Sequence, residues 1–168
     1  RRHTRYWRDW SSDVCSSDLD SEDSKTPLMR NLLLANQNLN QKKLVFCLVG
    51  DGEMNEGSIW ESLLVATHHN LSNLTIIIDN NHSSTRALKL PNISKILKDM
   101  EFNVYEVDGH NLKKILTAIS KSNKNLKPKI IIANTIKGFG IPQLENNPAW
   151  HHLSPSESEY VQMVQDLK

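Results

Sequence analysis

The chain has 168 residues, which is enough for one domain with a substantial hydrophobic core. Its formal net charge is +1 and no basic block stands out, so the sequence does not suggest a nucleic-acid-binding protein. The apolar runs are too short to cross a bilayer, and two cysteines are too few for a disulfide scaffold, so we expect a cytoplasmic protein.

The first stretch of the chain, RRHTRYWRDWSSDVCSSDLDSEDSK, differs from the rest. It has no hydrophobic periodicity, and it lacks the charged start and apolar middle of a signal peptide. The piece RDWSSDVCSSDL resembles translated sequencing-adapter read-through, and a disordered native tail is the alternative. We therefore expect residues 1–24 to be a non-native or disordered leader, and residues 25–168 to form one domain that is truncated at its start.

Helix-like and strand-like patterns alternate after this leader. Amphipathic spacing predicts helices over residues 28–39, 53–71, 92–100, 112–122 and 154–168. Apolar runs bounded by polar residues predict strands over residues 43–50, 73–81 and 128–138, and a strand followed by a turn over residues 103–111. Asn92 is expected to cap a helix, and Ser154 with Glu157 to form a capping box. This alternation predicts an α/β domain, a parallel sheet with helices on both faces.

Each predicted strand is followed by glycines and polar residues: Gly50 to Gly52, Asp79 to Asn81, Asp108 to His110, and Thr135 to Gly140. In parallel sheets, ligands bind beyond the carboxyl ends of the strands, so these residues should gather at one edge.

The first of these stretches, GDG, predicts a site for an anion that is bound through a cation. Glycines let the backbone approach a bulky anion, and the N-terminus of the following helix favours phosphate. Asp51 would repel phosphate unless a cation lay between them, and the oxygens of Asp51 and Asn81 suit Mg2+ or Ca2+. No Cys/His cluster suggests zinc.

The stretch GDGEMNEGSIWESL…NLTIIIDNN resembles the thiamine diphosphate motif, in which GDG is followed by NN. Together with EVDGHN, IIANTIKGFG and ENNPAWHH, it is similar to the N-terminal cofactor-binding domain of transketolases, above all the split, two-subunit kind. The resemblance covers roughly residues 28–168. It implies a thiamine diphosphate-binding fold, thiamine diphosphate with Mg2+ (or Ca2+), and two-carbon ketol transfer between sugar phosphates. A separate pyrimidine-binding chain, the C-terminal transketolase subunit, would complete the enzyme.

The same resemblance implies roles for individual residues. The metal ligands would be Asp51, Asn81 and the backbone carbonyl of Ser83. Contacts to the cofactor would come from Gly50, Asp51, Gly52, Glu53, Asn81, Lys137 and His151. The catalytic residues would be Glu56, Glu61 and His151. Of these, Glu56 and Glu61 would take part in a proton network at the contact with the partner chain.

Several of these residues have a structural alternative. Asp51 has the spacing to cap the next helix, and Glu61 lies three residues after Ser58, which is capping-box spacing. Asn80 and Asn81 have the alternative of an ordinary turn pair, and His151 that of a surface turn.

Two further residues at the strand ends are expected to position their neighbours. His110 is expected to shape its turn, and Asp79 to orient Asn81 or the loop that follows it.

The chain also departs from the family pattern. Transketolases usually carry a Gln and an Asp-Gly turn soon after NN, whereas this chain has HSSTRALKLP, and residues 1–27 contain no Gly-rich cofactor loop. The alternatives are another thiamine diphosphate enzyme, of the deoxyxylulose phosphate synthase or 2-oxo acid dehydrogenase type, or an inactive fragment. ENNPAWHH argues against the first. For the second, intact Asp51 and Asn81 argue against decay by substitution, whereas the missing upstream part of the family domain argues for an inactive fragment. A nicotinamide-binding module fits poorly, because GxGxxG is absent after the first strand.

Overall fold

The computed structural model describes residue 35 and residues 43–82, 91–121, 125–151 and 153–167. The predicted leader, residues 1–24, lies outside these ranges, and its boundary with the domain stays a prediction. Of the helix predicted over residues 28–39, only Ala35 is described; it is helical and fully buried.

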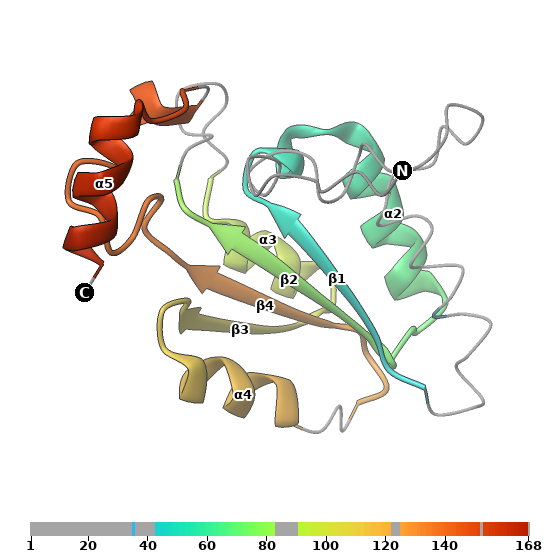
Figure 1. Ribbon diagram of the computed structural model, residues 1–168. Helices are drawn as coiled ribbons and strands as arrows, with labels where there is room; N and C mark the ends of the chain where they lie inside the picture. Colours follow the sequence, from blue (N-terminus) through green and yellow to red (C-terminus); the bar gives the residue numbers. More distant parts are fainter. Residues whose placement is uncertain (1–34, 36–42, 83–90, 122–124, 152, 168) are drawn as a thin grey trace, which may run out of the picture.

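Four parallel strands form one sheet, as the sequence predicts. They are β1 (Val45–Gly50), β2 (Leu74–Asn80), β3 (Asn103–Asp108) and β4 (Lys129–Asn134). Their order across the sheet is β1-β2-β4-β3, so the chain skips one position after β2 and returns to fill it with β4 (Figure 1). Strand β4, which is paired on both sides, is the most completely buried of the four.

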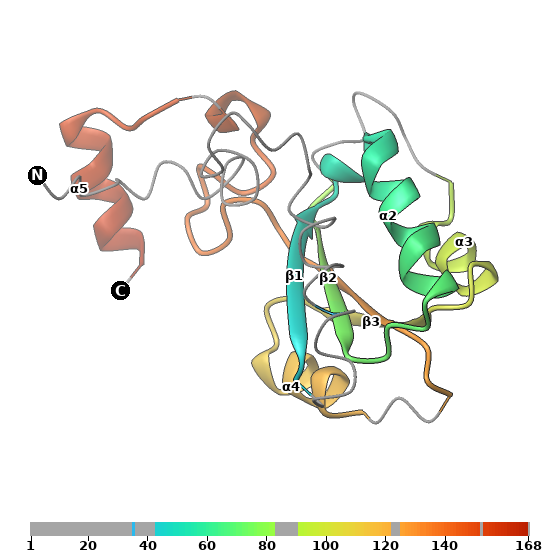
Figure 2. The ribbon, with the colours of Figure 1, turned by 90° about the vertical axis from the view of Figure 1, so that its right-hand side faces the viewer.

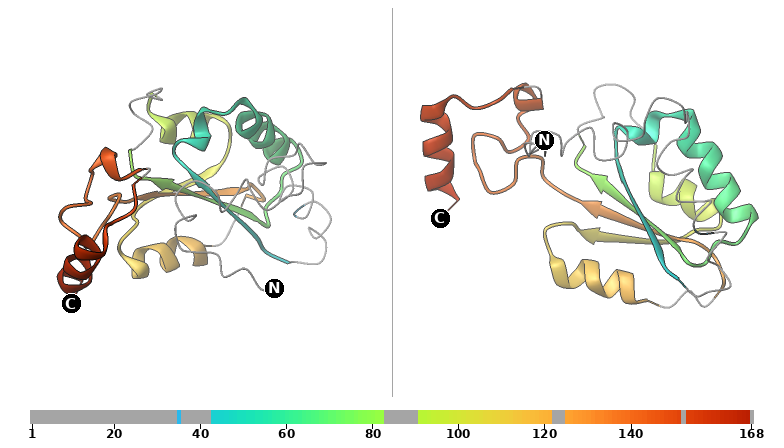
Figure 3. Two further views of the ribbon diagram at one scale, coloured as in Figure 1. Left: turned by 45° about the horizontal axis from the view of Figure 1, so that its top comes forward. Right: turned by 45° about the vertical axis from the view of Figure 1, so that its right-hand side comes forward.

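Helices cover both faces of this sheet, which confirms the predicted α/β architecture. The helices are α2 (Gly57–His68), α3 (Ile93–Asp99), α4 (Leu112–Ser120) and α5 (Glu157–Asp166). Helices α2 and α3 lie on one face and α4 on the other (Figures 1 and 3). The segment after β4, which ends in α5, extends beyond the carboxyl ends of the strands (Figure 2). The helix predicted over residues 53–71 is interrupted: a short 3-10 turn, η3 (Glu53–Asn55), precedes α2.

The hydrophobic core lies between the sheet and the helices α2 and α3. Its strand and helix side chains are almost completely buried: Cys47, Val49, Ile59, Leu63, Ala66, Ile76, Ile78, Leu97, Ile130 and Ile132. Each large aliphatic side chain buried in this way contributes about 1.5–3 kcal/mol. The same apolar runs that predicted the strands therefore supply one side of this core.

A buried lysine fixes the start of β4. Lys129 is 3% exposed, and its Nζ donates hydrogen bonds of 2.7 Å to the carbonyl oxygens of Ile119 and Lys121. These carbonyls lie at the C-terminal end of α4, where helical hydrogen bonding leaves acceptors without partners. Burial lowers the pKa of the Lys129 ammonium below its usual value. The lysine thus joins α4 to the central strand through polar contacts inside an apolar setting.

The helix caps agree only in part with the sequence. Asn92 caps α3 as predicted, because its side chain accepts from the backbone N–H of Lys95. The capping box predicted for Ser154 and Glu157 is wrong: it forms two residues later.

In the observed capping box, Ser156 is the N-cap of α5 and Glu159 is its partner. The sequence SPSESE contains the same Ser-x-x-Glu spacing twice. The later start brings both Glu157 and Glu159 into the first turn, where carboxylates interact favourably with the helix dipole.

None of the helices in the described part of the chain is long and apolar enough to span a membrane. The cytoplasmic location expected from the sequence stays a prediction.

The substitution Lys129→Met is expected to lower the free energy of unfolding by about 1–3 kcal/mol. Methionine keeps the buried stem but leaves the carbonyls of Ile119 and Lys121 without their donor. Urea denaturation followed by circular dichroism measures the change. Lys127→Met is the matched control, because Lys127 pairs with the exposed Glu101 at 3.5 Å. That control should change stability by less than about 0.5 kcal/mol, and an equal effect of the two variants would contradict the role of Lys129.

The capping box makes the stability of α5 depend on pH. Hydrogen bonds from the Ser156 hydroxyl and backbone N–H lower the pKa of Glu159 below its usual value. A lowered folded-state pKa gives stability that is present above the unfolded-state pKa and is lost as pH falls through the folded-state value. Hydrogen-exchange protection in α5, corrected for intrinsic rates, should therefore fall with pH in that acidic window. Glu159→Gln should weaken this dependence more than Glu157→Gln does; an equal dependence in the two variants would contradict the assignment.

Candidate functional site

The register of the sheet brings the polar strand ends to one level. Gly50 of β1 pairs with Asp79 of β2, and Asn80 of β2 pairs with Asn134 of β4. On the other side of β4, Asn134 pairs with Asp108 of β3. The residues that follow the strands therefore meet at a single edge of the sheet, as the sequence predicts.

Asp51 continues the pairing of β1 with β2 by one residue. Its backbone N–H donates to the carbonyl oxygen of Asp79 at 3.0 Å, and the residue is only 7% exposed. Asp51 caps neither helical segment, because Gly52 is the N-cap of η3 and Glu56 is that of α2. Asp51 is therefore not the N-cap that the structural alternative requires, and it is buried at the strand end.

The turn after β1 is closed by Glu53. The N–H of Gly50 donates to Glu53 Oε2 at 2.6 Å. Burial raises the pKa of the Glu53 carboxyl, the hydrogen bond from Gly50 opposes that shift, and the nearby charge of Glu56 adds to it. The structure thus gives Glu53 a contact within the turn; its predicted contact with a cofactor stays a prediction.

Gly52 faces open space. Its φ of −66° and ψ of −41° are accessible to any residue, so the backbone conformation does not require glycine. A Cβ added here would meet no heavy atom within 4 Å. The backbone of Gly52 is therefore open to the close approach of a ligand, a space that a side chain would partly fill.

Asp79 connects Asn81 to the end of β4. Its Oδ2 accepts from Asn81 Nδ2 at 3.2 Å, and its Oδ1 accepts a short hydrogen bond from the Thr135 hydroxyl. The Asn81 amide is thereby oriented with its nitrogen toward Asp79, and that hydrogen bond does not use its oxygen. This contact agrees with the expectation that Asp79 orients Asn81.

The first residue of the asparagine pair, Asn80, is part of the sheet. Asn80 is the last residue of β2, and its Nδ2 donates to Asn134 Oδ1 at 2.7 Å. Its carbonyl oxygen accepts from the N–H of Thr135 at 3.2 Å. The alternative of a turn pair is therefore wrong for Asn80.

Lys137 supplies positive charge beside these carboxylates. Burial lowers the pKa of its ammonium, while the charges of Asp51 and Asp79 act to raise it. Both carboxylates therefore lie close enough to interact with the lysine, although β1, β2 and the loop after β4 are far apart in the sequence. The site combines the buried Asp51 and the half-buried Asp79 with the ammonium of Lys137, an arrangement that suits an anionic ligand bound through a metal ion.

The oxygen donors fit a hard divalent cation. Among the residues that the structure describes, no group of three His, Cys, Asp or Glu side chains could hold a metal. A metal here would need the amide oxygen of Asn81 and a backbone carbonyl in addition to Asp51, which is a donor set that Mg2+ accepts. Ser83, the predicted source of that carbonyl, lies outside the described residues.

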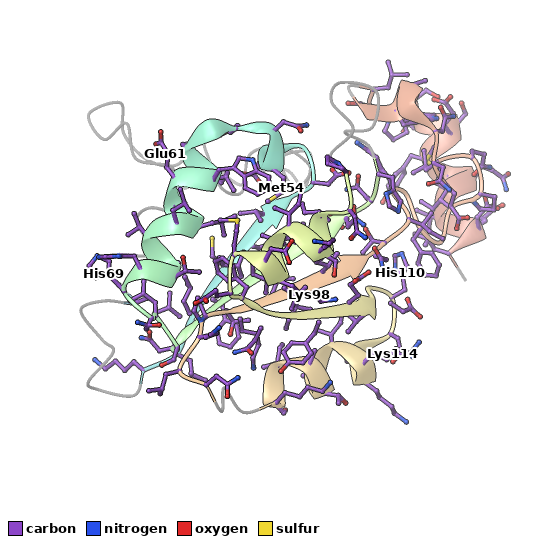
Figure 4. All side chains as sticks on the ribbon, turned by 180° about the vertical axis from the view of Figure 1, so that it is seen from behind. Met54, Glu61, His69, Lys98, His110 and Lys114 are labelled. Carbon is purple, nitrogen blue, oxygen red and sulfur yellow. The ribbon has the colours of Figure 1, made fainter. Side chains whose placement is uncertain are left out.

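The predicted catalytic residues Glu56 and Glu61 belong to α2 and its N-cap. Glu56 and Glu61 are exposed, and Figure 4 shows Glu61 on the outer side of α2, pointing away from the sheet. Ser58 lies inside α2, so the capping box considered for Glu61 does not form. His151 is the last residue of a second 3-10 turn, η5 (Pro148–His151), and its side chain lies outside the described part.

Sequence reasoning missed how His110 contacts the loop after β4. His110 does shape its own turn, because its N–H donates to Asp108 Oδ1 at 3.0 Å. Its ring also stacks on that of Phe139, and its Nε2 accepts from the N–H of Ile136. The contacts of Thr135 and His110 both cross between strand ends, so only the register of the strands could have predicted them.

Comparisons with known proteins identify the family of the domain. The family profile described as "Transketolase, thiamine diphosphate binding domain" matches residues 31–167. Over 147 residues, 84% of this chain, the sequence is 33% identical to an apulose-4-phosphate transketolase subunit of Actinobacillus succinogenes. Over 114 residues, 64% of this chain, it is 44% identical to the transketolase-like protein 2 of Mus musculus. The chain spans 53% of the first relative and 18% of the second.

Solved structures show the same fold. A transketolase from Campylobacter jejuni superposes with a TM-score of 0.62 and 26% identity, covering 71% of this chain and 21% of that one. A transketolase from Pichia stipitis gives a TM-score of 0.68 over 82% of this chain and 22% of that one. Its identity of 22% supports the fold alone. The thiamine diphosphate-binding fold expected from the sequence is thus confirmed.

The contact between Asp79 and Thr135 can be tested by an isosteric substitution. Thr135→Val removes the hydroxyl donor from the Asp79 carboxylate and is expected to lower the free energy of unfolding by about 1–2 kcal/mol. Thr135→Ser keeps the hydroxyl and loses only a methyl group, so its cost should stay below about 1 kcal/mol. Urea denaturation measures both variants. A larger loss in Thr135→Ser than in Thr135→Val would mean that packing, and not the hydrogen bond, matters at this position.

Proposed function

The chain belongs to the transketolase family of thiamine diphosphate-binding domains, and on that premise we propose that it is the cofactor-binding half of a transketolase. It would bind thiamine diphosphate with Mg2+ for two-carbon ketol transfer between sugar phosphates. The observation that carries the proposal is the meeting of Asp51, Asn81 and Lys137 at one edge of the sheet. Because the chain spans about half of its bacterial relative, the activity of the whole enzyme is part of the proposal.

The metal would be held by the residues that follow β1 and β2. Asp51 offers a buried carboxylate oxygen, and Asn81 offers the amide oxygen that its hydrogen bond to Asp79 does not use. The carbonyl of Ser83 completes the proposed set. A divalent ion between these ligands would offset the negative charge of Asp51 toward a diphosphate, as hard cations do in sites of this kind.

The diphosphate would lie over the open backbone of Gly52, within reach of Lys137. The absence of a side chain at Gly52 leaves room for this approach. The ammonium of Lys137, which already interacts with Asp51 and Asp79, would share its charge with the ligand. Gly50 and Glu53 would contribute by fixing the turn. When bound, thiamine diphosphate would supply the carbon nucleophile of ketol transfer.

The exposed glutamates at the start of α2 suit a contact with another chain. We propose that Glu56 and Glu61 face the C-terminal transketolase subunit, which binds the pyrimidine, and take part there in a proton network. Their exposure supports this role, since neither carboxylate caps α2. The similarity to a protein that is named as one subunit of a transketolase also supports a partner chain. His151 is proposed to lie near the diphosphate and the reaction centre.

Calorimetric titration with thiamine diphosphate, with and without Mg2+, tests the proposed cofactor site. The full chain should be titrated alone and in the presence of a purified C-terminal transketolase subunit. We expect binding that depends on Mg2+, and we expect Asp51→Ala to weaken it at least about 100-fold because a charged ligand of the metal is lost. Asp99→Ala is the matched control, since Asp99 lies at the end of α3 and pairs with Lys95 on the surface.

A folded sample that binds no thiamine diphosphate under either condition would overturn the proposal. Equal affinity of the wild type and Asp51→Ala would overturn the metal assignment.

A further inference from the structure

We propose that His110 is a positioning residue that holds the turn carrying Lys137, so that its loss weakens cofactor binding without unfolding the domain. This inference rests on the proposed contact between Lys137 and the diphosphate. His110 itself follows β3, whereas Lys137 follows β4. The connection between them is thus a contact between two neighbouring strand ends.

Lys137 lies in the middle of a tight turn. The N–H of Phe139 donates to the carbonyl oxygen of Ile136 at 3.2 Å, which closes a turn with Lys137 and Gly138 at its centre. Gly138 has a φ of 76°, the conformation that the third residue of a type II turn requires and that glycine adopts without strain. The direction of the lysine side chain therefore depends on how this turn is held.

One imidazole ring contacts both ends of that turn. The Nε2 of His110 accepts from the N–H of Ile136 at 2.8 Å. The ring of His110 stacks on that of Phe139, with centroids 3.7 Å apart and planes at 19°. Because Ile136 and Phe139 flank Lys137 and Gly138, the two contacts bracket the lysine.

The backbone that carries the imidazole is fixed as well. The N–H of His110 donates to Asp108 Oδ1 at 3.0 Å, and the N–H of Gly109 donates to the carbonyl oxygen of Asn134 at 2.8 Å. A Cβ on Gly109 would clash with Cγ2 of Thr135, so only glycine allows the end of β3 to approach β4 this closely. This close approach brings the ring of His110 over the turn, and Figure 4 shows His110 beside the segment that follows β4.

The hydrogen bond from the Ile136 N–H to Nε2 defines the tautomer of the neutral His110 ring. A nitrogen that accepts carries no proton, so the neutral imidazole carries its proton on Nδ1. With the turn held, the Lys137 ammonium stays near Asp51 and Asp79, where the diphosphate is proposed to bind. Without that contact, binding would also have to order the lysine and its turn, which lowers affinity.

The test compares three substitutions in the full chain. His110→Phe keeps a stacking ring and removes the acceptor, and His110→Gln restores an acceptor without the ring. His69→Phe is the matched control, because His69 lies at the far end of α2 (Figure 4). The readouts are hydrogen exchange of the Ile136 amide, the 15N resonances of the His110 ring, and titration with thiamine diphosphate and Mg2+ in the presence of the C-terminal transketolase subunit.

We expect an unprotonated Nε2 in the neutral wild-type ring and faster exchange of the Ile136 amide in His110→Phe. Cofactor affinity should fall about tenfold in that variant, which corresponds to ordering one long side chain. His110→Gln should recover part of both losses, and His69→Phe should match the wild type. Unfolding midpoints of the variants, measured alongside, should stay close to that of the wild type.

Two results would overturn this role of His110. Equal exchange of the Ile136 amide in the wild type and His110→Phe would show that the ring does not hold the turn. Faster exchange with unchanged cofactor affinity would show that His110 is structural only. If the wild type binds no thiamine diphosphate, the proposed function fails and the cofactor role of His110 fails with it. Amide exchange then still decides whether the ring holds the turn.

Discussion

The site depends on the common register of four parallel strands. Because Gly50 pairs with Asp79, and Asn134 pairs with both Asn80 and Asp108, each strand delivers its polar residues at the same level. A slip of one residue in any strand would move its end by about 3.3 Å and turn each side chain to the opposite face. The apolar runs that bury the strands thus also determine which atoms meet beyond their carboxyl ends.

The two halves of the sheet are held in different ways, and the site lies between them. Strand β4 is covered on both faces, and Lys129 joins its start to α4. On β1, by contrast, Phe46 is 46% and Leu48 48% exposed, because α4 covers only the β3 and β4 side (Figure 3). Asp51 therefore depends on the face of β1 that packs on α2 and on the pairing with β2 that its own N–H extends.

Patterns confined to one stretch of sequence predicted the elements and many of the candidate residues. Apolar runs predicted all four described strands, and Asn92 caps its helix as expected. The capping box predicted at Ser154 was wrong because the same Ser-x-x-Glu spacing recurs two residues later. Local chemistry alone could not choose between the two possible starts of α5. The contacts of Thr135 and His110 could not be predicted, because they depend on the register and on the close approach that Gly109 permits.

The charges of the site are divided between the two halves of the sheet. The acidic groups are Asp51, which follows β1, and Asp79, near the end of β2, whereas the cation, Lys137, follows β4. Asp79 already spans this boundary through Thr135, which fixes the acidic side against the end of β4. The turn that carries Lys137 is held from the other neighbour of β4, by His110 after the end of β3. The balance between acid and cation that an anionic ligand would meet therefore depends on two separate contacts between strand ends.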